Sequence, residues 1–266
     1  MKDSMISPLA YIHPQAKISE NVRIHPFCFV GPNVEIASDC VLHPHTVIHK
    51  HTKIGHNNTF YSFASIGGDP QDYTYKGEDT ELIIGDGNIF HENVTLNRGT
   101  LKEEGVTRIG SNSLIMAYVH VGHDCVLGNN LTIANSCNLA GHVHVEDGVI
   151  IGGGTSVQQF VNLRQGCYIG GATAVNKDIP SFCTAYGNRV VLKGVNIIGM
   201  KRKNYERKEI MEVVDLIRSI ESSDFSPLAF IEKKELISEF NLNNPIIQKI
   251  IADIKNSRVG IAPFGS

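Results

Sequence analysis

A short segment near the middle of the chain combines residue types that suit acid–base chemistry. It reads HVGHDC and spans residues 120–125. A histidine that titrates near neutral pH can take a proton from a hydroxyl group, and an adjacent carboxylate can orient or polarise its ring. His123 is therefore a candidate general base, with Asp124 as its neighbouring carboxylate.

The residues eighteen positions further along could complete such a site. Gly141 stands eighteen residues after His123, Gln159 eighteen residues after that, and His142 follows Gly141. A glycine leaves its backbone N–H unshielded, so Gly141 could stabilise the oxyanion of an acyl transfer. A second interpretation stays open, in which His120, His123 and His142 bind zinc.

The eighteen-residue spacing reflects a repeat of six residues. An aliphatic or aromatic residue recurs at every sixth position over residues 12–66, again over 84–96, and then over 109–175. Small or β-branched residues form a second series four positions later. A period of six does not fit an α-helix, but it fits a short strand and a turn, and three such units close one coil of a parallel β-helix. The repeat predicts roughly nine coils, stacked about 4.8 Å apart.

Cysteine placement argues against disulfide bonds. Five of the six cysteines occupy the second inward series, where a small buried hydrophobic residue is expected: Cys28, Cys40, Cys125, Cys137 and Cys167. The pattern favours free thiols in a reducing compartment.

Two polar segments interrupt the repeat, at residues 67–83 and 97–108. Loops that project from a rigid scaffold are frequent locations of binding and catalytic residues. After residue 175 the repeat ends, and apolar residues at helical spacing follow Asn204. The pairs Ser226-Pro227 and Asn244-Pro245 are typical of helix starts. We expect a β-helix domain over residues 1–190, carrying both insertion loops, and a small helical domain over 191–266.

Composition narrows the function classes. The chain has 24 Lys and Arg against 27 Asp and Glu, for a formal net charge of −3, so nothing in the charge favours nucleic acid binding. No apolar stretch is long enough for a transmembrane segment, and the N-terminal residues do not resemble a signal peptide. We expect a cytoplasmic protein.

Several motifs resemble a known family, the UDP-N-acetylglucosamine O-acyltransferases of lipid A biosynthesis. They are IGGDPQD (66–72), YKGE (75–78), HVGHDC (120–125), LAGHV (139–143), QF (159–160) and GVNIIGMKRK (194–203). The resemblance covers essentially the whole chain. It implies a left-handed parallel β-helix with a helical C-terminal domain, assembled as a homotrimer with active sites between adjacent subunits.

The resemblance also implies an activity. A (3R)-3-hydroxyacyl chain would pass from acyl carrier protein to the 3-hydroxyl of UDP-N-acetylglucosamine, the first step of lipid A biosynthesis, without a metal or small-molecule cofactor. Carried onto this chain, His123 is the general base, Asp124 its carboxylate partner and Gly141 the oxyanion donor.

Substrate-binding positions follow from the same resemblance. Asp72 would contact the sugar and His142 the N-acetyl group. The nucleotide-sugar and phosphopantetheine region would be lined by His120, Gln159, Asn196 and Arg202. Gly171 matches the position that limits acyl-chain length, because a glycine leaves the groove open.

The chain departs from the family at five positions. The family usually has Lys, His, His, Glu and Arg at the positions of Thr74, Gln158, Arg189, Ile198 and Lys203. Chain length and a 3-amino acceptor sugar therefore stay open. Three other functions are alternatives: the related N-acyltransferase, whose extra N-terminal domain would not fit before Ile12, a trimeric zinc enzyme, and a structural β-helix, whose regular Thr-x-Thr arrays are absent from the sequence.

Overall fold

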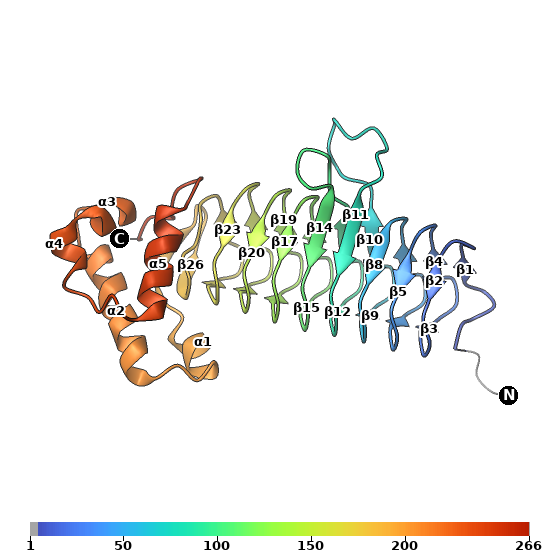
Figure 1. Cartoon of the computed structure of the whole chain (residues 1–266), viewed down its shortest axis with the longest axis horizontal. Coiled ribbons are helices and arrows are strands. Elements are labelled where there is room, and N and C mark those ends of the chain that lie inside the picture. The colour runs from blue at the N-terminus through green and yellow to red at the C-terminus, as the bar shows by residue number, and fades with distance from the viewer. Residues whose placement is uncertain (1–4, 266) are drawn as a thin grey trace.

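Short strands alternate with turns along the repeat, and three strands complete each coil of a left-handed parallel β-helix. The structure, a computed structural model, describes residues 5–265. Within the coils, equivalent strands of successive coils pair in parallel, as where His120 and Val121 lie opposite Asn138 and Leu139. The coils stack into an elongated column with a group of helices at its C-terminal end (Figure 1).

Over residues 5–265, the three faces of the column are sheets of nine, eight and ten strands. The first sheet contains β1 (Tyr11–Ile12), β4 (Phe29–Val30), β7 (Val47–Ile48), β10 (Ser65–Gly68), β13 (Thr95–Asn97), β16 (His120–Val121), β19 (Asn138–Leu139), β22 (Ser156–Val157) and β25 (Ala174–Val175). The second contains β2 (Lys17–Ile18), β5 (Glu35–Ile36), β8 (Thr52–Ile54), β11 (Glu81–Ile84), β14 (Val106–Ile109), β17 (Val126–Leu127), β20 (His144–Val145) and β23 (Asn162–Leu163). The third contains β3 (Arg23–Ile24), β6 (Val41–Leu42), β9 (Thr59–Phe60), β12 (Ile89–Phe90), β15 (Leu114–Ile115), β18 (Thr132–Ile133), β21 (Ile150–Ile151), β24 (Tyr168–Ile169), β26 (Cys183–Tyr186) and β27 (Val191–Val195).

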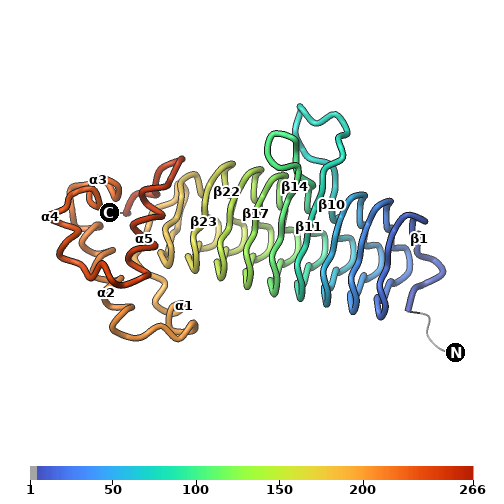
Figure 2. Tube along the Cα trace, in the orientation of Figure 1, coloured from blue at the N-terminus to red at the C-terminus, as the bar shows by residue number. Residues whose placement is uncertain are grey.

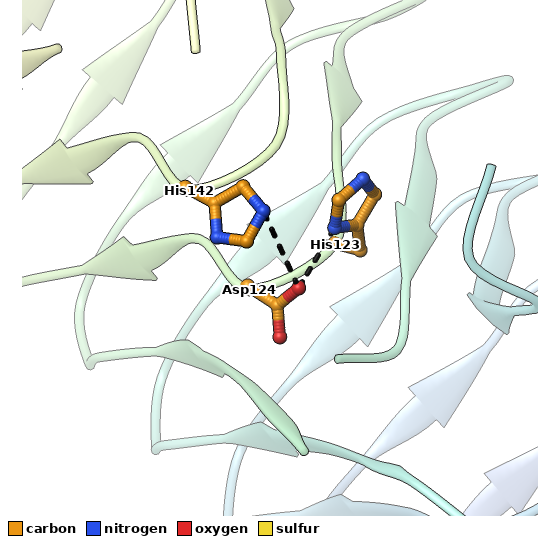
Figure 3. A group of neighbouring side chains, drawn as sticks. All are labelled: His123, Asp124 and His142. Carbon is orange, nitrogen blue, oxygen red and sulfur yellow. Dashed lines mark hydrogen bonds and ion pairs between the residues drawn. The ribbon is translucent and has the colours of Figure 1, made fainter. Parts of the chain in front are cut away.

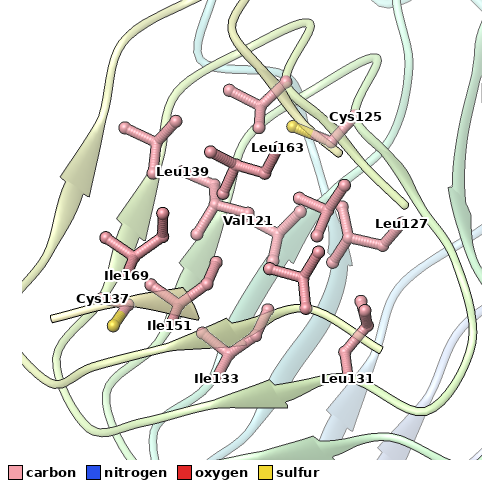
Figure 4. Packing of buried hydrophobic residues seen from close by; sticks show 14 of the residues in the cluster. Val121, Cys125, Leu127, Leu131, Ile133, Cys137, Leu139, Ile151, Leu163 and Ile169 are labelled. Atoms are coloured by element: carbon pink, nitrogen blue, oxygen red, sulfur yellow. The ribbon is translucent and has the colours of Figure 1, made fainter. Parts of the chain in front are cut away.

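The core of the column is the aliphatic series of the repeat. Val121, Leu139 and Val157 stack in successive coils of the first sheet, and each is at most 2% exposed. Figure 4 shows this packing together with the small residues of the second series, such as Cys125 and Cys137. Each coil buries its inward residues only against the coils on either side of it. All six cysteines are buried and free, as predicted.

Two loops project together from one side of the column (Figures 1 and 2). The expected insertions, 67–83 and 97–108, are too wide. Gly68 pairs with Asn97 and Glu81 with Val106, so the polar ends of both insertions extend the flanking strands. The segments outside strands are residues 69–80, here the first loop, and residues 98–105, here the second loop.

The helices that follow the coils are α1 (Ile197–Arg202), α2 (Arg207–Glu221), α3 (Pro227–Glu232), α4 (Lys234–Ile237) and α5 (Pro245–Lys255). The two predicted helix starts are confirmed. The hydroxyl of Ser226 accepts a hydrogen bond from the Ala229 N–H, and the Asn244 side chain accepts from Ile246 and Ile247. No helix in the described residues is long and apolar enough to cross a membrane.

The junction between coils and helices differs in detail from the sequence expectation. β27 pairs antiparallel with β26, so residues 191–195 extend the third sheet although they fall within the expected helical domain. α1 was not predicted, and α2 begins at Arg207, where Glu206 and Glu209 form a reciprocal cap. The division at 190/191 stays a prediction, and its outer ends, 1–4 and 266, lie outside the described residues.

Candidate active site

Two consecutive turns of the coil bring His123, Asp124 and His142 together (Figure 3). His123 and Asp124 lie in the turn between β16 and β17, and His142 lies in the equivalent turn one coil further on. His123 Nδ1 lies 2.8 Å from Asp124 Oδ2, and His142 Nε2 lies 3.9 Å from the same oxygen. The two imidazole rings meet edge to face with centroids 5.0 Å apart. All three side chains are buried.

Asp124 is held by the second loop. Its Oδ1 accepts a hydrogen bond from the Thr100 N–H and its Oδ2 from the Thr100 hydroxyl, each at 2.7 Å. Burial alone would raise the pKa of Asp124, but the hydrogen bonds from His123 and Thr100 outweigh it, and the pKa is lowered. An ionised carboxylate only accepts, so His123 donates through Nδ1, and neutral His123 keeps its lone pair on Nε2.

Gly141 packs directly against the His123 ring. A Cβ at position 141 would lie 2.6 Å from His123 Cε1 and 2.7 Å from Nε2. The Gly141 N–H donates to no acceptor among the described residues. Both residues line a cleft of about 330 Å³ along the first sheet, together with Gln71, His120, Asn138 and Gln159.

His120 occupies the floor of this cleft. Its Nδ1 lies 2.8 Å from the hydroxyl of Thr95 in the preceding coil. Burial and then the nearby His123 lower the pKa of His120. A neutral imidazole at this position can bind a polar substrate group without adding charge to the cleft.

Asp72 reaches the cleft from the first loop. Its Oδ2 lies 3.9 Å from His123 Nε2, a gap that a substrate hydroxyl could bridge. Lys102 of the second loop donates to Oδ2 at 2.6 Å, and Thr74 donates to Oδ1 through its N–H and its hydroxyl. The hydrogen bonds from Lys102 and then Thr74 hold the pKa of Asp72 well below its usual range.

His142 packs beside His123, next to the cleft. The Phe160 ring stacks on it with centroids 4.5 Å apart, and Glu103 Oε1 lies 3.5 Å from its Nδ1. Burial lowers the pKa of His142 more than the nearby Asp124 raises it, so His142 favours the neutral form.

A separate hollow of about 680 Å³ lies along the third sheet, where α1 begins. It holds Asn196, Ile198, Arg202 and Lys203. The Asn196 side chain caps α1 by accepting from the Gly199 N–H and donates to the Gly166 carbonyl. The Arg202 guanidinium makes no ion pair with any described residue, so it is free to bind an anion such as a phosphate.

Gly171 lies in the turn between β24 and β25 and lines neither the His123 cleft nor the Arg202 hollow. A Cβ there would lie 3.2 Å from the Gly153 carbonyl oxygen, and the only other heavy atom within 4 Å is the Gly153 nitrogen. The space beside Gly171 is therefore otherwise open.

The structure groups most, but not all, of the predicted site residues. Seven lie in or beside the His123 cleft: Asp72, His120, His123, Asp124, Gly141, His142 and Gln159. A single chain does not bring Gly171, Asn196 and Arg202 to that cleft. Gly171 lies in the turn after β24, Asn196 caps the start of α1, and Arg202 is the last residue of α1.

The zinc interpretation does not hold in its predicted form. Among residues 5–265, the side chains placed to share a metal ion are His123, Asp124 and His142, with ligand atoms within 4.8 Å of one another, and His120 is not in this group. Both Asp124 oxygens already accept hydrogen bonds from Thr100, and one also from His123. These donors fit a proton-transfer pair, and a metal ion would have to displace them.

Sequence reasoning missed four contributors: Gln71, Thr100, Lys102 and Phe160. Gln71 and Phe160 stand beside residues that were singled out, within the PQD and QF motifs. Thr100 and Lys102 lie in the second loop, whose polar composition marked it as a functional segment. No spacing rule connects them to Asp124 or Asp72, because loop contacts do not follow the period of the coils.

Comparison with known protein families matches both parts of the chain. A family model described as "Udp N-acetylglucosamine O-acyltransferase; Domain 2" matches residues 178–262. A second, described as "Bacterial transferase hexapeptide (six repeats)", matches residues 15–50 and 107–141. The two matches correspond to the helical end and to the coils.

Similar proteins and solved structures cover nearly the full chain. The acyl-[acyl-carrier-protein]--UDP-N-acetylglucosamine O-acyltransferase of Herminiimonas arsenicoxydans is 42% identical, over 97% of this chain and 99% of its own length. The protein of that name from Helicobacter pylori is 46% identical, over 97% and 94%. A UDP-N-acetylglucosamine acyltransferase structure from Bacteroides fragilis superposes with a TM-score of 0.92 at 37% identity, covering 97% of this chain and 99% of that one.

Proposed function

Because the chain belongs to the UDP-N-acetylglucosamine O-acyltransferase family, we propose that it moves a (3R)-3-hydroxyacyl chain from acyl carrier protein to the 3-hydroxyl of UDP-N-acetylglucosamine, the first step of lipid A biosynthesis. The observation that carries the proposal is the His123 site. An imidazole with a free Nε2, oriented by an ionised carboxylate, stands beside a glycine N–H that finds no acceptor in the described part of the chain.

The reaction follows from these groups. His123 Nε2 removes the proton of the sugar 3-hydroxyl as that oxygen attacks the thioester carbonyl. Negative charge that develops on the carbonyl oxygen is stabilised by the Gly141 N–H. The intermediate then collapses, the carbon–sulfur bond breaks, and the proton held by His123 passes to the departing thiolate. Asp124 keeps the ring oriented and stabilises the imidazolium that forms.

The remaining residues bind substrate. Asp72 contacts the sugar and His142 its N-acetyl group, while His120 and Gln159 line the cleft beside them. Asn196 and Arg202 bind the nucleotide-sugar and phosphopantetheine region, and Gly171 limits the acyl chain. The free Arg202 guanidinium and the open space beside Gly171 support the last two roles.

We further propose that the active enzyme is a cytoplasmic homotrimer with sites between subunits. Its support is the division of the substrate-binding residues: the His123 cleft lies along the first sheet and the Arg202 hollow along the third. A neighbouring subunit that presents its third sheet to the first sheet of its partner would complete the site.

The activity is tested with purified protein, a panel of 3-hydroxyacyl thioesters of acyl carrier protein, and UDP-N-acetylglucosamine or its 3-amino analogue as acceptor. The proposal predicts ester formation at the 3-hydroxyl. Absence of acyl transfer to the hydroxyl acceptor, with a folded protein, would contradict it.

The division of the site between subunits is tested by mixing. His123→Ala and Arg202→Ala chains, each inactive alone, are coexpressed with different tags and purified through both. Mixed trimers with shared sites should regain about a third of wild-type activity, because one interface in three then carries both native residues. If each chain held a complete site, the mixture would stay inactive.

A further inference from the structure

An ion pair joins the two projecting loops beside the catalytic imidazole. Lys102 Nζ of the second loop lies 2.6 Å from Asp72 Oδ2 of the first loop, and that oxygen lies 3.9 Å from His123 Nε2. Resting on the proposed function, we propose that Lys102 is a further substrate-binding residue, which donates hydrogen bonds to oxygen atoms of the nucleotide sugar while holding Asp72 toward His123.

Two carboxylates near His123 carry negative charge that a neighbouring cation can offset. Asp124 lies on one side of the ring and Asp72 near the other, and hydrogen bonds keep both ionised near neutral pH. Two carboxylates would repel the diphosphate of a nucleotide sugar. Lys102 offsets this charge, since Arg98, the buried cation at the base of the loops, is already bound by Gly67, Asp69 and Tyr75.

The Lys102 ammonium has donors to spare. An ammonium group carries three N–H donors, and Asp72 accepts one. The Lys102 side chain is 48% exposed, so its head group is not enclosed by protein. It adjoins a cavity of about 320 Å³ between the two loops, lined also by Thr74, Tyr75 and Thr100. The remaining donors can therefore reach a bound ligand.

The backbone before Lys102 is anchored to the catalytic carboxylate. Thr100 binds Asp124 through its N–H and its hydroxyl, and the Lys102 N–H lies 3.4 Å from the Thr100 hydroxyl. The position of the ammonium is thereby tied to the position of the His123–Asp124 pair. This coupling is what a substrate-binding group needs, because it must lie in register with the reacting atoms.

Thr74 leaves one oxygen of Asp72 to Lys102. Thr74 uses its N–H and hydroxyl to hold Asp72 Oδ1, at 2.7 and 2.6 Å, and leaves Oδ2 to Lys102. The first loop therefore lacks a cation at position 74, and the second loop supplies one to the same carboxylate.

The test measures UDP-N-acetylglucosamine binding by calorimetry, and KM and kcat for both substrates, in Lys102→Gln, Lys102→Arg and the double variant Thr74→Lys/Lys102→Gln. We expect Lys102→Gln to weaken nucleotide-sugar binding and to raise its KM by about tenfold or more, with little change in the KM for the acyl donor. Lys102→Arg should retain most of the affinity. The double variant should recover to within about threefold of wild type, because it returns a cation to Asp72 from the first loop.

Lys76→Gln is the matched control. Lys76 is an exposed lysine of the first loop whose ammonium donates to the Tyr73 carbonyl at 3.3 Å, and its loss should leave both KM values unchanged. An inactive wild-type enzyme would refute the proposed function. An active wild type with unchanged nucleotide-sugar affinity in Lys102→Gln would refute the role of Lys102 alone. Loss of affinity that the double variant does not restore would also overturn it, since Lys102 would then act only by bracing the loop.

Discussion

The α-carbon of Gly141 lies against the imidazole of His123, so closely that a Cβ at position 141 would come within 2.6 Å of the ring. Any larger residue must displace the ring or the turn. Gly141→Ala is therefore expected to lower kcat by about a hundredfold, while the coils stay folded. The measurement is kcat together with the thermal unfolding temperature. Near-normal turnover in a folded variant would show that the contact is not needed for catalysis.

The carboxylate that orients His123 gives a graded prediction. Asp124→Asn removes the charge that stabilises the imidazolium and the acceptor that fixes the Nδ1–H tautomer, so kcat should fall by about 10² to 10⁴. Thr100→Val removes one hydrogen bond to Asp124 Oδ2 and keeps the charge, so its loss should be smaller. Steady-state kinetics at saturating substrates measure both. A larger fall in kcat for Thr100→Val than for Asp124→Asn would contradict this prediction.

The position beside Gly171 should control chain length. Because the space next to its α-carbon is open beyond Gly153, a methionine side chain would enter it. Gly171→Met should shift the preference toward donors several carbons shorter, with activity on short chains retained. The profile is measured with acyl carrier protein thioesters of graded length. A profile identical to that of wild type would remove Gly171 from the acyl groove.

Buried histidines should make the fold less stable in acid. Burial lowers the pKa of His142 in the folded chain, so below its ordinary value of about 6.5 the unfolded chain binds more protons than the folded one. Stability therefore declines as the pH falls from that value toward the lowered pKa.

His142→Gln removes one buried histidine. Between about pH 7.5 and 5.5, the free energy of unfolding should therefore fall less in this variant than in wild type. Thermal unfolding across this range measures the difference. Parallel declines in the two proteins would mean that His142 does not contribute to the pH dependence.

Much of the fold follows from the repeat, for a physical reason. Each inward residue of the β-helix has the same environment in every coil, so a period of six is visible without knowledge of contacts. The same regularity brought His123 and Gly141 together, since eighteen residues make one coil. Where the strand pairing departs from the six-residue period, the boundaries of the elements were predicted less accurately. The insertion boundaries were too wide because Gly68 and Glu81 join strands, and β27 and α1 were missed.

The parts of the site that could not be predicted from spacing are those fixed by loops. Thr100 binds Asp124 although the two residues are 24 positions apart, and Lys102 binds Asp72 although they are 30 positions apart. Both contacts depend on loop conformations that follow no repeat. Asn196 and Arg202, expected in active sites between subunits, line a hollow along the third sheet, on another face of the column from His123. Their place on this face could not be predicted from spacing, because both residues follow the last coil of the repeat.

The most direct test of the account is the turnover of His123→Ala with a 3-hydroxyacyl donor and UDP-N-acetylglucosamine, compared with His144→Ala. His144 is an exposed histidine at the start of β20, outside the cleft. The account predicts that His123→Ala lowers kcat by at least about a hundredfold while the oligomer persists, and that His144→Ala behaves as wild type. A His123→Ala enzyme with near-normal turnover would contradict the assignment of His123 as the general base.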